Sequence, residues 1–197
     1  MMKFKKKLLS LIMSFMILIV SVLPFTALTV FAFDSIQILD SSSNVVQEIP
    51  VETENITEPL KQSLQFCALN ASSQNVLTIK MPAGEYVITK TNTATSNTVL
   101  DLTNGTIIRN DCPGRGNIIN SPSGYYGYDG LYNFTLRGGE LSYTDNNVNE
   151  STISRIAHAN GVRFENVKFT DGFISHFVEV AGSTNVVFDR CVFDGFT

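Results

Sequence analysis

One short pattern occurs twice between residues 161 and 193, and this repeat constrains the fold more than any other feature of the chain. The apolar residues of the first copy return in the second at one constant offset, so that Val162, Phe164, Val167 and Phe169 correspond to Val186, Phe188, Cys191 and Phe193. Alternating apolar residues predict short β-strands. Copies of one strand unit at a regular spacing predict units that stack on each other.

Three earlier copies of the pattern extend this prediction over most of the chain. They are Ile79, Met81, Gly84 and Tyr86, then Leu100, Leu102, Gly105 and Ile107, then Phe134, Leu136, Gly139 and Leu141. The spacing between successive copies varies, and it is widest between the second copy and the third. Repeats of about 20 to 50 residues with alternating apolar positions predict a β-solenoid with insertions in its loops. An antiparallel sandwich also has alternating strands, but five copies in one register favour the solenoid.

The segments before the first copy have other patterns. Residues 57–70 carry apolar side chains every three or four positions, which predicts an amphipathic helix, with Thr57 as its N-cap. Such a helix would cover the first end of the solenoid. Residues 33–56 are polar with scattered apolar positions, and we interpret them as a linker or an edge segment.

The N-terminal segment, residues 1–32, has the pattern of a signal peptide. Four lysines precede a long apolar run at residues 8–23, and Val30 and Ala32 suit cleavage after Ala32. A retained membrane anchor is the alternative, because the run could just span a bilayer. Cleavage predicts a secreted or cell-surface protein that contacts the membrane only before the signal peptide is removed. The lysine-rich signal peptide is typical of a bacterial protein. Loss of the four lysines takes the formal charge from −4 to −8, so we expect no nucleic-acid partner.

The three cysteines, Cys67, Cys112 and Cys191, leave at least one thiol unpaired within the chain. Cys191 occupies an apolar repeat position, and we expect it to be a small buried hydrophobe. The sequence has no metal-ligand spacing, and we predict no metal site from it.

Several segments resemble the pectate lyase-like superfamily of right-handed parallel β-helices. They are TIKMPAGEYVI at residues 78–88, TVLDLTNGTIIR at 98–109, YDGLYNFTLRGGEL at 128–141, and the two copies after residue 161. The resemblance implies an all-β fold, a right-handed parallel β-helix (β-solenoid) over residues 57–197, with a short N-terminal capping helix. It also implies a secreted protein that is associated with polysaccharide.

This superfamily includes polysaccharide hydrolases, calcium-dependent lyases, and non-catalytic adhesins and surface proteins. The paired-aspartate, GHG, RIK and WIDH elements of its enzymes are missing from this sequence. We therefore expect an inactive N-terminal portion of a longer polysaccharide hydrolase or lyase, incomplete at its C-terminus. An oligomer or further coils would cover its last rung. No cofactor is evident, and calcium would be needed if the whole protein is a lyase. The alternative is a non-catalytic cell-surface β-helix that binds glycans or proteins.

Two acidic residues, Glu165 and Asp189, share a repeat position with Arg137. Coils about 4.8 Å apart would separate the two carboxyl groups by about 5 Å, near the spacing of a retaining glycosidase pair. They are therefore candidate catalytic residues or calcium ligands. The alternative, which we favour, is a ladder of ion pairs in which Arg137 and Arg190 neutralise the two acids.

Glu179 is the best single candidate for a catalytic acid. In a strand over residues 175–180, Glu179 would share the outward face with Phe177. His176 would point toward the interior with the valines, or would lie at a strand end. We expect His176 to be structural.

Aromatic residues of the longest insertion, residues 110–133, are candidates for substrate binding. Tyr125, Tyr126 and Tyr128 stand among glycines there, and sugar sites commonly present an amphipathic ring. Loops on a rigid scaffold usually carry binding residues. Packing of the tyrosines against the coil is the alternative. His158 follows in a turn from which it could reach a groove.

Overall fold

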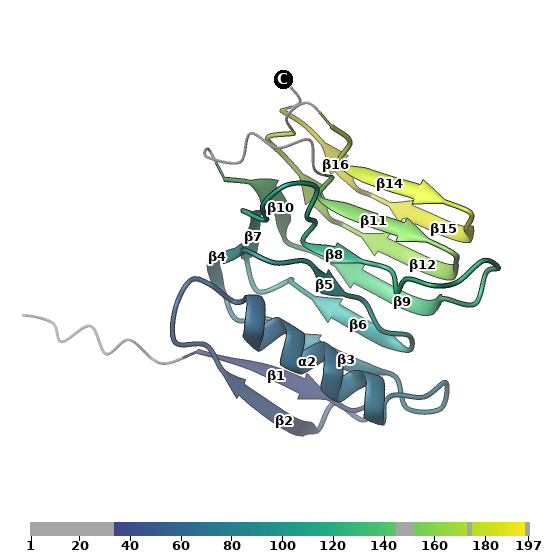
Figure 1. Cartoon of the computed structure of the whole chain (residues 1–197). Helices are drawn as coiled ribbons and strands as arrows, with labels where there is room; N and C mark the ends of the chain where they lie inside the picture. The colour runs from purple at the N-terminus through teal and green to yellow at the C-terminus, as the bar shows by residue number, and fades with distance from the viewer. Residues whose placement is uncertain (1–33, 145–151, 173–174, 196–197) are drawn as a thin grey trace, which may run out of the picture. The chain divides into compact units, whose positions relative to one another are not determined.

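A computed structural model describes residues 34–144, 152–172 and 175–195. The predicted signal peptide lies outside the described residues. The described chain is predominantly β, with three sheets and one helix (Figure 1).

Sheet A has seven strands in the order β15-β12-β9-β6-β3-β1-β2. Its strands are β1 (Ser35–Leu39), β2 (Val45–Pro50), β3 (Leu77–Lys80), β6 (Thr98–Asp101), β9 (Leu131–Arg137), β12 (Ala159–Glu165) and β15 (Thr184–Asp189). The hairpin of β1 and β2 is antiparallel, and β1 joins β3 antiparallel at the edge of the sheet. All later pairs in sheet A are parallel.

Sheets B and C are parallel throughout their described strands. Sheet B has the order β16-β13-β10-β7-β4, and sheet C has the order β14-β11-β8-β5. Sheet B consists of β4 (Gly84–Ile88), β7 (Thr106–Asn110), β10 (Glu140–Tyr143), β13 (Lys168–Phe169) and β16 (Val192–Phe193). Sheet C consists of β5 (Asn92–Thr93), β8 (Ile119–Asn120), β11 (Ser154–Ala157) and β14 (Val178–Ala181).

From β3 onward the chain visits sheets A, B and C in turn, and each visit adds a strand beside the previous one (Figure 1). Strands of one sheet are therefore separated by a whole repeat in sequence. Parallel strands need such crossover connections. The predicted repeat is thus expressed as three parallel stacks of strands.

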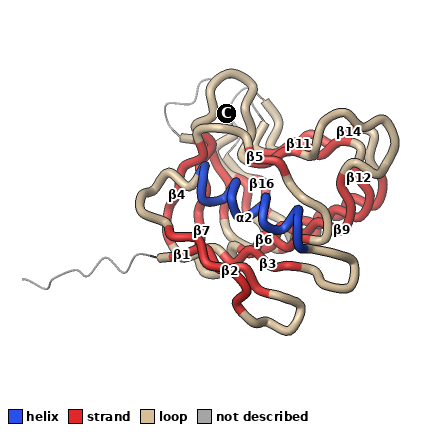
Figure 2. The backbone as a smooth tube through the Cα atoms, turned by 60° about the horizontal axis from the view of Figure 1, so that its bottom comes forward, coloured by secondary structure: helices blue, strands red, loops and turns tan. Residues whose placement is uncertain are grey.

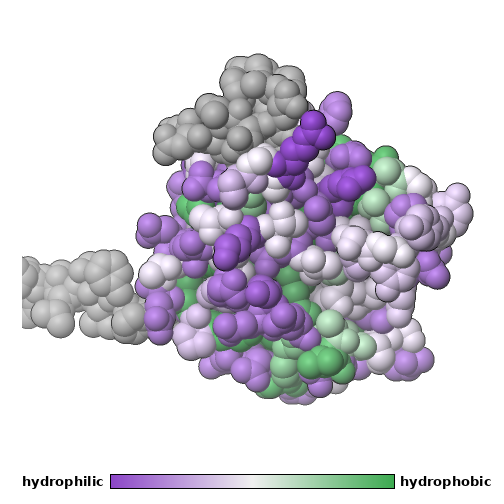
Figure 3. All heavy atoms as spheres, viewed as in Figure 1, coloured by the Kyte–Doolittle hydropathy of each residue, from purple (hydrophilic) through white to green (hydrophobic). Residues whose placement is uncertain are grey.

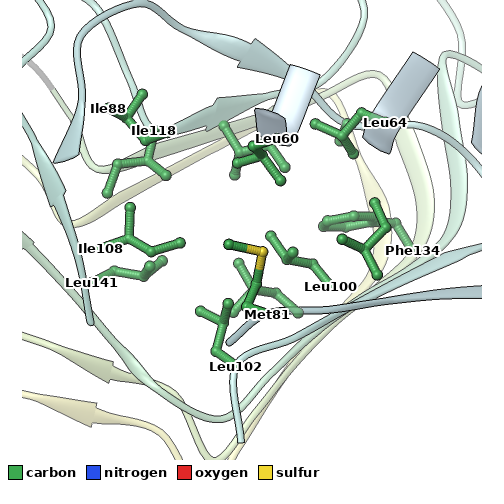
Figure 4. Packing of buried hydrophobic residues seen from close by; sticks show 14 of the residues in the cluster. Leu60, Leu64, Met81, Ile88, Leu100, Leu102, Ile108, Ile118, Phe134 and Leu141 are labelled. Carbon is green, nitrogen blue, oxygen red and sulfur yellow. The ribbon is translucent and has the colours of Figure 1, made fainter. Parts of the chain in front are cut away.

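Apolar side chains of equal register fill the space between the sheets (Figure 4). In sheet A the column is Ile79, Leu100, Leu136, Phe164 and Phe188, and in sheet B it is Tyr86, Ile108, Leu141, Phe169 and Phe193. The rings of Phe164 and Phe188 stack with centroids 4.9 Å apart and planes 3° apart. Such contacts add to the stabilisation from burial.

The register corrects the predicted alignment of the copies in two places. Leu100 pairs with Leu136 instead of Phe134, and Ile108, not Ile107, pairs with Leu141. The template assumed corners of equal length between sheets A and B. The structure instead has longer corners in the first two repeats than in the last three, so one template cannot hold both sheets in register.

The helix α2 (Thr57–Asn70) has the predicted bounds and buries the predicted apolar face, including Leu60 and Leu64. It packs against the first repeat beside β5 (Figures 1 and 2). The predicted N-cap is wrong, because Ile56 holds that position. The hydroxyl of Thr57 instead accepts a hydrogen bond from Thr89 N at 2.8 Å, which ties the helix start to the loop after β4.

The face shown in Figure 3 is mainly hydrophilic, with apolar side chains in small separate areas. Within the described ranges no helix is long and apolar enough to cross a membrane. The described residues also contain no cluster of three or more histidine, cysteine, aspartate or glutamate side chains that could hold a metal ion.

Candidate functional site

A polar cleft of about 600 Å³ lies over the outer face of sheet C. We call it the sheet C cleft. Its lining residues are Arg115, Asn117, Asn120, Thr152, Arg155, Ser175, His176 and Glu179. They come from three successive repeats, so the cleft depends on the stacking of strands that are far apart in sequence.

The register of three strands brings the central side chains together. Asn120 of β8 pairs with Arg155 of β11, and Arg155 pairs with Glu179 of β14. The neighbours of Arg155 in its strand, Ser154 and Ile156, are both buried. Because side chains alternate across a strand, the arginine must face outward, and its register partners lie above and below it.

An ion pair connects the last two of these strands. Nε of Arg155 donates a hydrogen bond to Oε1 of Glu179 at 3.2 Å. The two side chains are 52% and 41% exposed, so water screens the attraction and the pair stabilises the fold by less than about 1 kcal/mol. Both groups remain accessible from the cleft.

The inner wall of the cleft is built from amides. Asn117 is 4% exposed, and its Nδ2 donates a hydrogen bond to the carbonyl oxygen of Thr152 at 2.6 Å. That bond joins the loop before β8 to the loop before β11. The Oδ1 atom of Asn120 is buried and accepts no hydrogen bond from the described protein. Buried amide oxygens are nearly always partnered, so this unpaired oxygen is an unusual feature of the cleft wall.

The structure places Glu179 on the outer face as predicted, and His176 lies before the start of β14, but the predicted outward face of Phe177 is wrong. Phe177 packs against the core, where its ring centroid lies 6.3 Å from that of Phe169. His176 is exposed and lines the cleft. The alternation fails because β14 begins only at Val178.

Sequence reasoning missed the arginines and asparagines of the cleft. A signal for one of them was present, since the offset from Arg155 to Glu179 equals the offset between the last two copies of the repeat. Asn117 and Asn120 had no such signal, because they lie in the long insertion before β9, where the sequence cannot be aligned with the other copies of the repeat.

The other two acidic candidates belong to a ladder of ion pairs along the edge of sheet A. Glu165 accepts hydrogen bonds from Arg137 Nε at 2.9 Å and Arg163 Nε at 2.5 Å. Arg163 also binds Asp189 at 2.8 Å, and Arg190 binds the same carboxylate at 3.2 Å. The ladder favoured from the sequence is therefore present, with Arg163 as an additional bridge between the two acids.

These contacts also set the protonation of the two carboxyl groups. The pKa of Glu165 is lowered, chiefly by its hydrogen bond from Arg137 and further by the one from Arg163. For Asp189, desolvation raises the pKa, but hydrogen bonds from Arg190 and Arg163 outweigh it, and the net shift is downward. A general acid needs a raised pKa. The two carboxyl groups are thus held ionised, and each is paired with arginine.

The tyrosines of the long insertion form a separate exposed group near the end of β11. Tyr125, Tyr126 and Tyr128 are 42%, 95% and 58% exposed. The ring of Tyr126 meets that of His158 edge to face, with centroids 6.3 Å apart. Nδ1 of His158 forms a hydrogen bond with the carbonyl oxygen of Gly127 at 3.1 Å. None of these four residues lines the sheet C cleft.

The described side chains of the sheet C cleft are suited to binding. Glycoside hydrolysis generally uses two carboxyl groups about 5 to 9.5 Å apart, and among the described residues that line this cleft Glu179 is the one with a carboxylate. Arginines match carboxylates by forming two parallel hydrogen bonds. Arg115 and Arg155 therefore make the cleft suited to an anionic, hydroxyl-rich ligand.

Comparisons with known proteins place this chain in no family. No family model matches it, and no curated protein matches it. Among solved structures, it is similar to a crystal structure of a "putative glycosyl hydrolase" from Parabacteroides merdae, with 11% sequence identity and a TM-score of 0.36. The match covers 71% of this chain and 88% of the other.

Proposed function

We propose that this protein is a right-handed parallel β-helix of the pectate lyase-like type that binds an acidic polysaccharide in the sheet C cleft. The observation that carries the proposal is the cleft itself. Two arginines and an exposed histidine stand there beside an unsatisfied amide oxygen and a single carboxylate. The cyclic visits to three parallel stacks support the β-helix.

The charge of the cleft opposes that of the whole protein. The chain carries a formal charge of −4, whereas the cleft is lined by two guanidinium groups and one carboxylate. A local positive field in an acidic protein selects an anionic ligand and raises its rate of association. Uronate units offer carboxylates to the arginines and hydroxyl groups to the neutral polar side chains of the cleft.

Hydrolysis or lysis of the same polysaccharide by a longer form of the protein remains compatible with this binding role. The described cleft offers Arg115 and Arg155 for holding such a substrate. Calcium would enter such a mechanism only as part of a lyase. Export by residues 1–32 would place the binding site where extracellular polysaccharide is available.

Binding is tested with oligogalacturonate titrated into the full chain by isothermal titration calorimetry. We expect saturable binding that weakens as salt rises, because the contacts are ionic. Arg155→Ala should weaken it by about tenfold or more, since a hydrogen bond to a charged group contributes about 1.5–3 kcal/mol. Arg190→Ala is the matched control, because it removes an arginine outside the cleft.

Equal weakening by both variants would count against the cleft, and so would binding of neutral dextran that Arg155→Ala weakens as much as it weakens oligogalacturonate binding. Export is tested by N-terminal sequencing of protein recovered outside the expressing cells. A product that begins at Phe33 supports it, and an uncleaved membrane-bound chain refutes it.

A further inference from the structure

The side chain of Asn92 is the most unusual buried group among the described residues. Asn92 is 2% exposed and lies in the short strand β5. Both of its polar atoms, Oδ1 and Nδ2, are buried without a hydrogen-bond partner. Buried amides almost always have partners, and leaving them unpaired opposes folding. Some molecule with both a donor and an acceptor should therefore meet this side chain.

The residues at the same register position in the other repeats show that Asn92 is unusual. Asn92 pairs with Ile119, Ile119 with Ser154, and Ser154 with Val178, so these four side chains share one inward position of sheet C. Two of them are apolar, and the hydroxyl of Ser154 donates to the carbonyl oxygen of Ile119 at 3.0 Å. An apolar residue would satisfy this position, so packing alone does not account for an amide.

A cavity opens beside Asn92. It measures about 330 Å³ and lies between the helix α2 and the strand β5. Its lining residues are Lys61, Leu64, Gln65, Ala68, Thr91, Asn92, Thr93, Ala94, Thr95 and Pro122. This volume is at the lower end of the range for small-molecule sites, about 300–1,000 Å³. We call it the α2–β5 cavity.

The lining combines neutral polar groups with apolar ones. Gln65 and the threonines offer an amide and hydroxyls, and Leu64, Ala94 and Pro122 offer an apolar wall. Lys61 is the one charged residue among the described residues of the lining, and its Nζ lies 3.3 Å from Oε2 of Glu58. Because that ion pair already offsets the ammonium charge, the cavity favours a neutral ligand.

We propose that the α2–β5 cavity binds one neutral saccharide unit. The sugar would turn the Asn92 side chain from its buried position toward the cavity. Two neighbouring hydroxyl groups of the sugar then suit this amide, because one donates to Oδ1 while the other accepts from Nδ2. The C–H face of the ring lies against the apolar wall. The cavity shares no residue with the sheet C cleft, so this site stands apart from the proposed binding of acidic polysaccharide.

The test uses D-glucose, D-galactose and D-xylose, each titrated into the full chain by calorimetry. We expect saturable binding of at least one of them. Asn92→Leu should weaken that binding about tenfold, the change expected for losing two hydrogen bonds of ordinary strength. The same variant without sugar should melt at a higher temperature than the wild type, because it removes an unpaired amide from the core.

A second variant covers the case in which Asn92→Leu does not fold. Gln65→Met changes an exposed residue on α2 and should weaken the same sugar without lowering the melting temperature. Arg155→Ala should leave neutral-sugar binding unchanged, which separates this site from the cleft. The proposal is overturned if the wild type binds none of the three sugars, or if a crystal grown with the sugar shows only an ordered water at Asn92.

Discussion

Arg155 and Glu179 stand at the same register position on neighbouring strands of sheet C, with Nε of the arginine 3.2 Å from Oε1 of the glutamate. The glutamate therefore already accepts a hydrogen bond from the guanidinium group to which an anionic ligand would bind. An incoming carboxylate must compete with a carboxylate that the fold already supplies. Glu179, the best acidic candidate from the sequence, is thus positioned to weaken the binding of anions in this cleft.

Replacing Glu179 by Gln should tighten the binding of oligogalacturonate by about two- to fivefold, which corresponds to the energy of an exposed ion pair. The amide keeps the shape of the side chain but removes the competing charge. Calorimetry at low and high salt measures the effect, which should shrink as salt rises. A loss of binding would instead show that Glu179 contacts the ligand directly.

The ladder on sheet A predicts a pH dependence of stability. The pKa of Glu165 is lowered, chiefly by its hydrogen bond from Arg137, so its stabilising effect is complete above the unfolded-state pKa of about 4.3. The effect is lost as the pH falls through the lowered pKa of the folded state. Glu165→Gln should cost less than about 1 kcal/mol at neutral pH, since the pair is partly exposed.

Urea unfolding over a series of acidic pH values measures this difference. The curves of the variant and the wild type should converge once Glu165 is protonated in both folded and unfolded states. Glu52→Gln, at an exposed position before α2, is the control and should change stability little at any pH. A difference that persists at the lowest pH would mean that Glu165 stabilises the fold by packing.

The register predicts unequal effects of two adjacent isoleucines. Ile108 is fully buried and pairs with Leu141, while Ile107 is partly exposed and pairs with Glu140. Ile108→Ala should therefore lower the free energy of unfolding by about 2–5 kcal/mol. Ile107→Ala should lower it by less than about 1.5 kcal/mol, because less apolar surface returns to water. Chemical denaturation of the two variants measures both values, and equal effects would contradict the register.

The same pair shows how far the sequence could predict the fold. The apolar repeat was sufficient to predict parallel strand units and the helix of residues 57–70. It did not predict the true partners of Leu100 and Ile108, because corner length depends on local turn conformation. At the corner after β6, for example, Gly105 adopts a φ of +85°, a value that side-chain periodicity does not report.

The candidate site was predictable only in part, for a related reason. Glu179 follows a regular repeat, so its outward direction could be predicted. His176 and Phe177 precede the first residue of β14, where strand alternation no longer applies. Asn92 and Asn117 come from loops and short strands, and their importance lies in hydrogen bonds that are missing or buried. Such bonds have no signature in the order of residues.

The buried thiols predict a slow reaction with alkylating and disulfide reagents. Burial raises the pKa of Cys67 to about 12 and that of Cys112 to about 11. Because the thiolate is the reactive form, both should stay unmodified in the native protein at about pH 8. Cys191 is partly exposed and should react first. Mass spectrometry after timed iodoacetamide treatment identifies the order, and modification of Cys67 before unfolding would refute it.

Two glycines separate the effect of backbone conformation from the effect of close packing. Gly105 and Gly139 have φ values of +85° and +71°, so alanine is strained at both. A Cβ atom at Gly105 would meet nothing within 4 Å, whereas one at Gly139 would lie 2.5 Å from Leu102 Cβ and 2.7 Å from Thr106 O.

Gly105→Ala should therefore cost about 1–2 kcal/mol, the strain alone. Gly139→Ala should cost about 1–3 kcal/mol more, because backbone and core side chains must shift where two repeats touch. Urea unfolding of both variants measures the difference. If both variants lose the same free energy, the repeats at this corner are less tightly packed than the structure shows, and the stacked-strand arrangement there would need revision.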